Sequence, residues 1–174
     1  MNGSLALKIF GALMLPVVAA CGDDEPADPA TATSFTATLS GANEEPPVTT
    51  TAAGTATFEV NGSEITYTIT TTASIQNAIL GHIHLAAAGV NGPVRLNLCG
   101  TGAPEPACTS GTGVVATGTN GVTVGSPAIT FDDLLAAMRS GGAYVNVHTS
   151  SGPGCAPAPG CNPGGEIRGQ IVPQ

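Results

Sequence analysis

Apolar and polar side chains alternate with a period of two along much of the chain. Residues 35–39 and 56–60 follow this pattern, which is typical of strands with one buried face. Asn61-Gly62 then favours a tight hairpin turn, and residues 65–69 repeat the alternation on the returning strand. The same reasoning predicts further strands at residues 79–85, 94–98, 113–117, 143–149 and 166–172.

One segment has helical character. Asp132 and Asp133 open it, Arg139 closes it, and Gly141-Gly142 follows as a stop signal. Thr130 is suited to cap its first turn. About eight strands separated by turn residues, with one short helix, predict an all-β fold, an antiparallel β-sandwich.

Composition agrees with short strands and excludes several functions. The chain has 24 glycines and 14 prolines, and only 9% of its residues are charged. The net charge is −8, so a basic surface for nucleic acid is missing. Aromatic residues are only 3%, too few for the sugar platform of a glycosidase. No Gly-x-Ser-x-Gly motif indicates a serine nucleophile, and Glu44 and Glu45 in a proline-rich loop are expected to be solvated.

The N-terminus predicts export. Lys8 precedes an apolar run from Ile9 to Ala20, which is too short to span a bilayer. The small residues before Cys21 resemble a bacterial lipobox, which implies a lipoprotein signal peptide over 1–20 and acylation of Cys21. Residues 21–34 are then a disordered tether, and the domain occupies 35–174. This predicts a bacterial cell-envelope protein, extracytoplasmic and anchored to the membrane by lipid; the alternative is ordinary secretion with Cys21 in the discarded peptide.

The remaining four cysteines suit an oxidising compartment. Their spacing favours disulfides between Cys99 and Cys108 and between Cys155 and Cys161, although four cysteines allow three connectivities. Neither pair has the two-residue spacer of a zinc knuckle, which argues against a metal site.

All three histidines fall on predicted strands with matching parity. His82 and His84 lie opposite the aliphatic residues of segment 79–85, including Ile79. His148 likewise lies opposite the valines of segment 143–149. We therefore expect the imidazoles to gather on a face turned away from the core.

Three imidazoles predict a metal site that suits copper and, less well, zinc. Glu166 and Arg168 share the corresponding face of segment 166–172. Glu166 is expected as a fourth ligand or as a partner that orients an imidazole, and Arg168 as a guide for an anionic substrate. The alternative is that the histidines face solvent or hydrogen-bond to loop carbonyls.

Four segments carry a family resemblance: residues 35–48, 81–84, 143–149 and 162–170. Together they resemble the CHRD domain, a module named after chordin and common in bacterial secreted proteins. The resemblance covers about Phe35 to Val172. It implies an immunoglobulin-like β-barrel or sandwich without a settled biochemical activity.

A fainter similarity links His82, His84, His148 and Arg168 to the copper/zinc superoxide dismutases, which are Greek-key β-sandwiches. The chain departs from them because it has no metal-bridging histidine and no zinc-binding loop. Two functions follow as hypotheses, beside the possibility of a structural domain whose histidine face only completes hydrogen bonds. The first is a non-catalytic binding module for an extracytoplasmic protein, a small ligand or a metal; the alternative is a copper-dependent oxidoreductase.

Overall fold

Nine strands and one α-helix make up the part of the chain that the computed structural model describes, residues 28–100, 102, 104–150 and 160–174. The strands are β1 (Ser34–Ser40), β2 (Ala53–Asn61), β3 (Glu64–Ile75), β4 (Ala78–Leu85), β5 (Val94–Cys99), β6 (Gly111–Asn120), β7 (Ala143–Thr149), β8 (Ile167–Gln170) and β9 (Val172–Pro173). The helix is α1 (Phe131–Arg139), and two 3₁₀ turns are η1 (Pro29–Thr31) and η2 (Gly41–Asn43). The prediction of an all-β fold with one short helix is confirmed.

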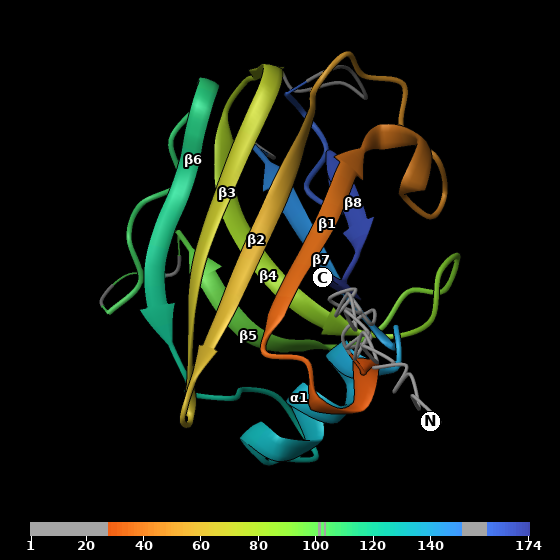
Figure 1. Ribbon diagram of the computed structural model, residues 1–174. Helices are drawn as coiled ribbons and strands as arrows, with labels where there is room; N and C mark the ends of the chain where they lie inside the picture. The colour runs from red at the N-terminus through yellow and green to blue at the C-terminus, as the bar shows by residue number, and fades with distance from the viewer. Residues whose placement is uncertain (1–27, 101, 103, 151–159) are drawn as a thin grey trace, which may run out of the picture.

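The strands form one antiparallel sheet in the order β5-β4-β7-β8-β1-β2-β3-β6, with β9 paired to β1. The sheet folds over on itself, so that β6, β3, β2 and β1 lie in one layer and β5, β4, β7 and β8 in the other (Figure 1). Its two ends nearly meet: Asn120 Nδ2 donates to Asn97 O at 2.9 Å. The result is a sandwich-like, nearly closed sheet.

The core lies between the two layers. Phe35, Phe58 and Ile69 are fully buried there, as the alternation predicts. The opposite face of β1, β2, β3 and β6 carries threonines in register, for example Thr57 beside Thr68. Strand alternation places these apolar residues on one face. Burial of each large aliphatic or aromatic side chain contributes about 1.5–3 kcal/mol, which turns that face toward the core.

The structure departs from the predicted pattern at two strand ends. Ile79, expected on the core face, is 38% exposed because the β4–β7 register shifts between Ala78 and Leu80. Segment 166–172 is not one strand but two, β8 and β9, separated at Ile171.

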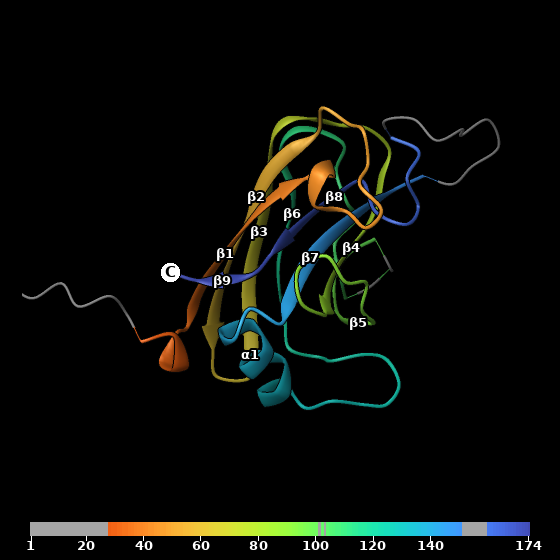
Figure 2. The same cartoon turned by 90° about the vertical axis from the view of Figure 1, so that its right-hand side faces the viewer.

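Helix α1 packs beside β7, β9 and η1 and closes one end of the sandwich (Figure 2). Thr130 caps it through a capping box with Asp133, as the sequence predicts. Part of the expected tether also packs on the domain: Ala32 is buried in the core, and its carbonyl accepts a hydrogen bond from Arg139 Nε. The predicted signal peptide and Cys21 lie outside the described residues.

The predicted Cys99–Cys108 disulfide is present. Cys161 is also disulfide-bonded, but its expected partner Cys155 lies outside the described residues. Within the described ranges, no helix is long and apolar enough to cross a membrane.

Candidate metal centre

Three neighbouring strands present one polar face, built by their pairing. His82 of β4 pairs with Asn146 of β7, which in turn pairs with Arg168 of β8. His84 pairs with Tyr144 in the next row. His148 is placed diagonally from His82, within reach across the strands. The parity argument thus brings the three predicted histidines together.

This face is turned away from the apolar core, as predicted, but it is not open to solvent, so the alternative of solvent-facing histidines does not hold. His82 and His84 are each 7% exposed, and His148 is 8% exposed. The loop after β4 covers His84, because Gly92 O lies 2.9 Å from its Nδ1. The loop before β8 covers His148, because Pro163 O lies 3.0 Å from its Nδ1. The polar face is therefore a second buried region, outside the apolar core.

The three imidazoles form a compact cluster. Ring centroids lie 5.0 Å apart for His82 and His148, 5.7 Å for His82 and His84, and 5.8 Å for His84 and His148. One nitrogen from each ring lies within 4.8 Å of the others. A single ion can be shared among them after a closing movement of about 1 Å, since imidazole–metal bonds measure about 2.0–2.1 Å.

Hydrogen bonds define which nitrogens carry protons. A carbonyl only accepts, so Nδ1 of His84 and of His148 donates to its loop carbonyl. His148 Nε2 then accepts from His82 Nδ1 at 3.2 Å. His84 Nε2 is buried and has no hydrogen-bond partner. When the cluster is neutral, each ring therefore has an unprotonated Nε2.

The surroundings keep the cluster neutral. Burial lowers the pKa of His82 to about 4, with help from His148 and His84. Burial also lowers the pKa of His84 to about 4, against the bond to Gly92 O and with help from His148 and Arg168. The pKa of His148 is lowered by burial as well. Neutral imidazole is the form that binds metal ions.

Tyr144 lies between His84 and Arg168. Its ring stacks on His84 with centroids 4.8 Å apart and planes 10° apart. The guanidinium carbon of Arg168 lies over the tyrosine ring, 3.4 Å from its centroid. A cation this close to an aromatic face stabilises the stack, so the positive charge lies one ring away from a candidate ligand.

Arg168 is 1% exposed and holds the loop after β4. Its NH2 group donates to Val90 O at 2.7 Å and to Ala87 O at 3.3 Å, and NH1 donates to Asn91 Oδ1 at 3.1 Å. These bonds position the loop; the role of Arg168 as an anion guide stays a prediction.

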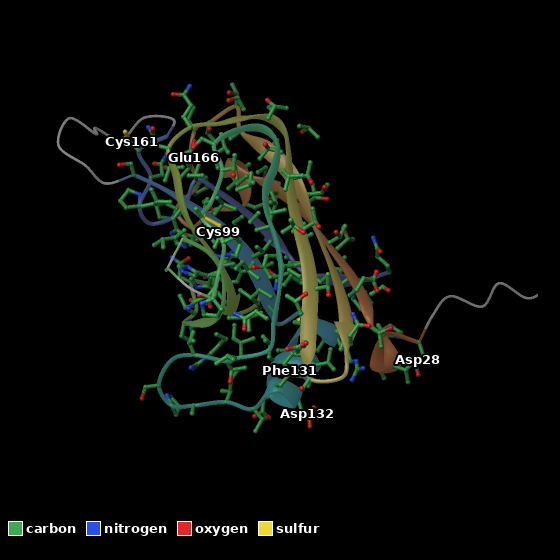
Figure 3. All side chains as sticks on the ribbon, turned by 90° about the vertical axis from the view of Figure 1, so that its left-hand side faces the viewer. Asp28, Cys99, Phe131, Asp132, Cys161 and Glu166 are labelled. Carbon is green, nitrogen blue, oxygen red and sulfur yellow. A yellow bond between two sulfur atoms is a disulfide. The ribbon has the colours of Figure 1, made fainter. Side chains whose placement is uncertain are left out.

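Glu166 is 1% exposed and holds the loop before β8. Its Oε2 accepts hydrogen bonds from Asn162 Nδ2 at 2.6 Å, Gly160 N at 2.9 Å and Thr149 Oγ1 at 3.1 Å. Figure 3 shows Glu166 and Cys161 together at the end of the domain opposite Phe131 of α1. Glu166 thus positions the segment that carries Pro163, and these bonds do not include an imidazole.

Glu44 is a site residue that the sequence reasoning missed. It was expected to be solvated, yet it is 5% exposed, and its Oε2 accepts from Asn146 Nδ2 at 3.2 Å. Burial raises its pKa to about 7, although Arg168 and Asn146 lower it. Glu44 also borders a cavity of about 320 Å³ that Arg168 and Gln170 line from the sheet side. Its membership of the segment 35–48 was the signal that could have singled it out.

The fold and this buried polar face define the class of the protein as a small all-β module. The four segments that carry the family resemblance include parts of β4, β7, β8 and β1, which are neighbours in the sheet. The family model of the CHRD domain matches residues 35–156. The chain therefore belongs to the CHRD domain family. No curated protein and no solved structure matches it.

Proposed function

We propose that this CHRD domain is a non-catalytic binding module that holds one transition-metal ion through His82, His84 and His148. The proposal includes the location predicted from sequence, a bacterial envelope with Cys21 as the lipid anchor. An extracytoplasmic protein or small ligand remains the second kind of partner in this proposal.

The observation that carries the proposal is the buried, unpartnered Nε2 of His84. A buried acceptor without a hydrogen bond costs about 1–3 kcal/mol. The other nitrogen of the same ring donates to a backbone carbonyl, which is the arrangement that fixes the tautomer of a metal-ligating histidine. A metal ion would provide the missing partner.

Copper suits the ligand set best, followed by zinc, because three imidazoles are nitrogen donors of intermediate softness. His148 is held in the same way as His84, by Pro163 O. The ion would replace the hydrogen bond in which His148 Nε2 accepts from His82 Nδ1. Two of the three ligands are therefore oriented before the ion arrives.

The alternative, a copper-dependent oxidoreductase of the superoxide-dismutase type, would use the same three ligands. It also requires a substrate to reach the ion. The exposures of the imidazoles, 7–8%, and of Arg168, 1%, favour binding over turnover.

Metal titration of the purified protein tests the proposal. We expect one equivalent of copper per chain, with uptake abolished in His84→Ala. Thr68→Ala, an exchange on the outward threonine face, is the matched control and should bind normally. Stoichiometric binding that survives His84→Ala would refute the site. Superoxide consumption by the copper-loaded protein would favour the oxidoreductase instead.

A further inference from the structure

The immediate surroundings of the three imidazoles contain a cation but no ligating anion. All three candidate ligands are neutral, and two of them donate to backbone carbonyls instead of carboxylates. The guanidinium of Arg168 lies on the far face of Tyr144, which stacks on His84. Its positive charge therefore lies one aromatic ring away from that candidate ligand.

The two buried carboxylates nearby are directed elsewhere. Glu166 Oε2 accepts three hydrogen bonds from Thr149 and the loop at 160–162. Glu44 is paired with Asn146. Among the described residues, the hydrogen bonds of the three imidazoles go to one another and to two backbone carbonyls, and not to a carboxylate. The positive charge of an ion bound by the cluster would therefore not be neutralised by a carboxylate ligand, although the site is buried.

Such a setting discriminates by charge. The cost of moving an ion from water into a low-dielectric interior rises with the square of its charge, so a monovalent ion has about a quarter of the cost of a divalent one. The guanidinium also repels the ion, and this repulsion is twice as large for a divalent ion as for a monovalent one. Three-histidine sites that hold Zn²⁺ keep a fourth position open for water or substrate, whereas the rings of this cluster are only 7–8% exposed.

Imidazole suits both copper and zinc, so the ligand type does not choose between these ions and we take their charge as the deciding property. We propose that the His82–His84–His148 cluster selects monovalent copper over divalent copper and zinc, with Arg168 as the residue that enforces the selection. This inference rests on the proposed metal-binding function and assigns the ion to that same site.

Competition against chelators of known affinity tests the selection on the whole protein. The metal probes are Cu⁺ under anaerobic reducing conditions, and Cu²⁺ and Zn²⁺ in separate titrations. We expect Cu⁺ to bind at least a hundredfold more tightly than Cu²⁺. Because a tenfold preference corresponds to 59 mV for one electron, the reduction potential of the bound ion should exceed that of the aqueous couple by about 120 mV.

Charge at position 168 provides the matched comparison. Arg168→Met removes the cation and should reduce the preference for Cu⁺ at least tenfold, whereas Arg168→Lys keeps the charge and should retain most of it. Circular dichroism checks that both variants fold. If Arg168→Met does not fold, the reduction potential of the unmodified protein still decides the question.

The outcomes separate this inference from the function on which it rests. Equal or tighter binding of Cu²⁺ or Zn²⁺ would overturn the selection while preserving the metal site. A potential at or below that of the aqueous couple would do the same. Failure of all three ions to bind would remove both the site and the selection.

Discussion

Replacing Glu44 with glutamine should stabilise the protein at neutral pH. Glu44 Oε1 and Asn146 Oδ1 are both buried acceptors without a partner. Both lie within 2.6 Å of the point that a Cβ on Gly165 would occupy, so they are close neighbours. A proton on Oε1 allows the acid to donate to Oδ1 while Asn146 Nδ2 donates to Oε2. The amide of glutamine offers the same donor and acceptor at every pH.

The raised pKa sets the size of the effect. The folded state holds the Glu44 proton up to about pH 7, whereas the ordinary pKa is 4.5. The stability that the protonated acid contributes is therefore complete below pH 4.5 and is lost as pH rises through about 7. At 1.36 kcal/mol per pKa unit, the loss amounts to about 3 kcal/mol above pH 7. The raised pKa of Glu44 already contains the effects of its neighbours: Arg168 and Asn146 lower it, and Glu166 raises it.

Urea unfolding at pH 5 and pH 8 measures the effect. The free energy of unfolding of Glu44→Gln should be close to that of the unmodified protein at pH 5 and about 3 kcal/mol higher at pH 8. The buried histidines act in the opposite direction, since their lowered pKa values remove stability as pH falls below 6.5, but they cancel in this comparison. Glu45→Gln, an exchange at the exposed neighbour, is the control. If the difference in unfolding free energy between Glu44→Gln and the unmodified protein does not increase from pH 5 to pH 8, the reasoning is refuted.

Three further exchanges test the fold. Gly165→Ala should reduce the unfolding free energy by about 3 kcal/mol, because φ is 141° and the new Cβ would lie 2.5 Å from Glu44 Oε1; urea unfolding should show a far smaller loss for Gly164→Ala, where the Cβ meets nothing. Replacing Cys99 and Cys108 by serine should cost about 2–3 kcal/mol in thermal or urea unfolding, from the entropy of a loop of 9 residues. Thr130→Ala should cost about 1 kcal/mol by the same measurement through loss of the helix cap, and an unchanged stability would show that the cap contributes nothing.

Strand alternation made most of the fold and the histidine cluster predictable. The parity of His82, His84 and His148 against their aliphatic neighbours is a local property of each strand. Their convergence needed only that β4 and β7 be neighbours, which the structure confirms. The cap at Thr130 and the Cys99–Cys108 bridge were predictable for the same reason, because both depend on residues close together in the chain.

The covering of the polar face was not predictable from local pattern. It depends on contacts between distant segments, such as Arg168 with Val90 and Asn43 Nδ2 with Arg168 O. A proline-rich loop with two glutamates is ordinarily solvated, but here Glu44 lies close to Gly165 and is hydrogen-bonded to Asn146, both distant in sequence. Alternation says which side of a strand a residue occupies, but it does not say whether a loop lies over that side.

The burial of this second face changes what its residues can do. Histidines on an open surface would be solvated and would need no partner, so their clustering would carry little meaning. Enclosed by two loops, the same rings lose solvent, and one of them is left with an unpaired nitrogen. The loops themselves are held by a buried arginine and a buried glutamate, whose desolvation costs several kcal/mol each unless it is compensated by such bonds. A hydrogen-bonding role alone explains the outer nitrogens of His84 and His148. It leaves Nε2 of His84 without a hydrogen-bond partner, and a bound ion would supply one.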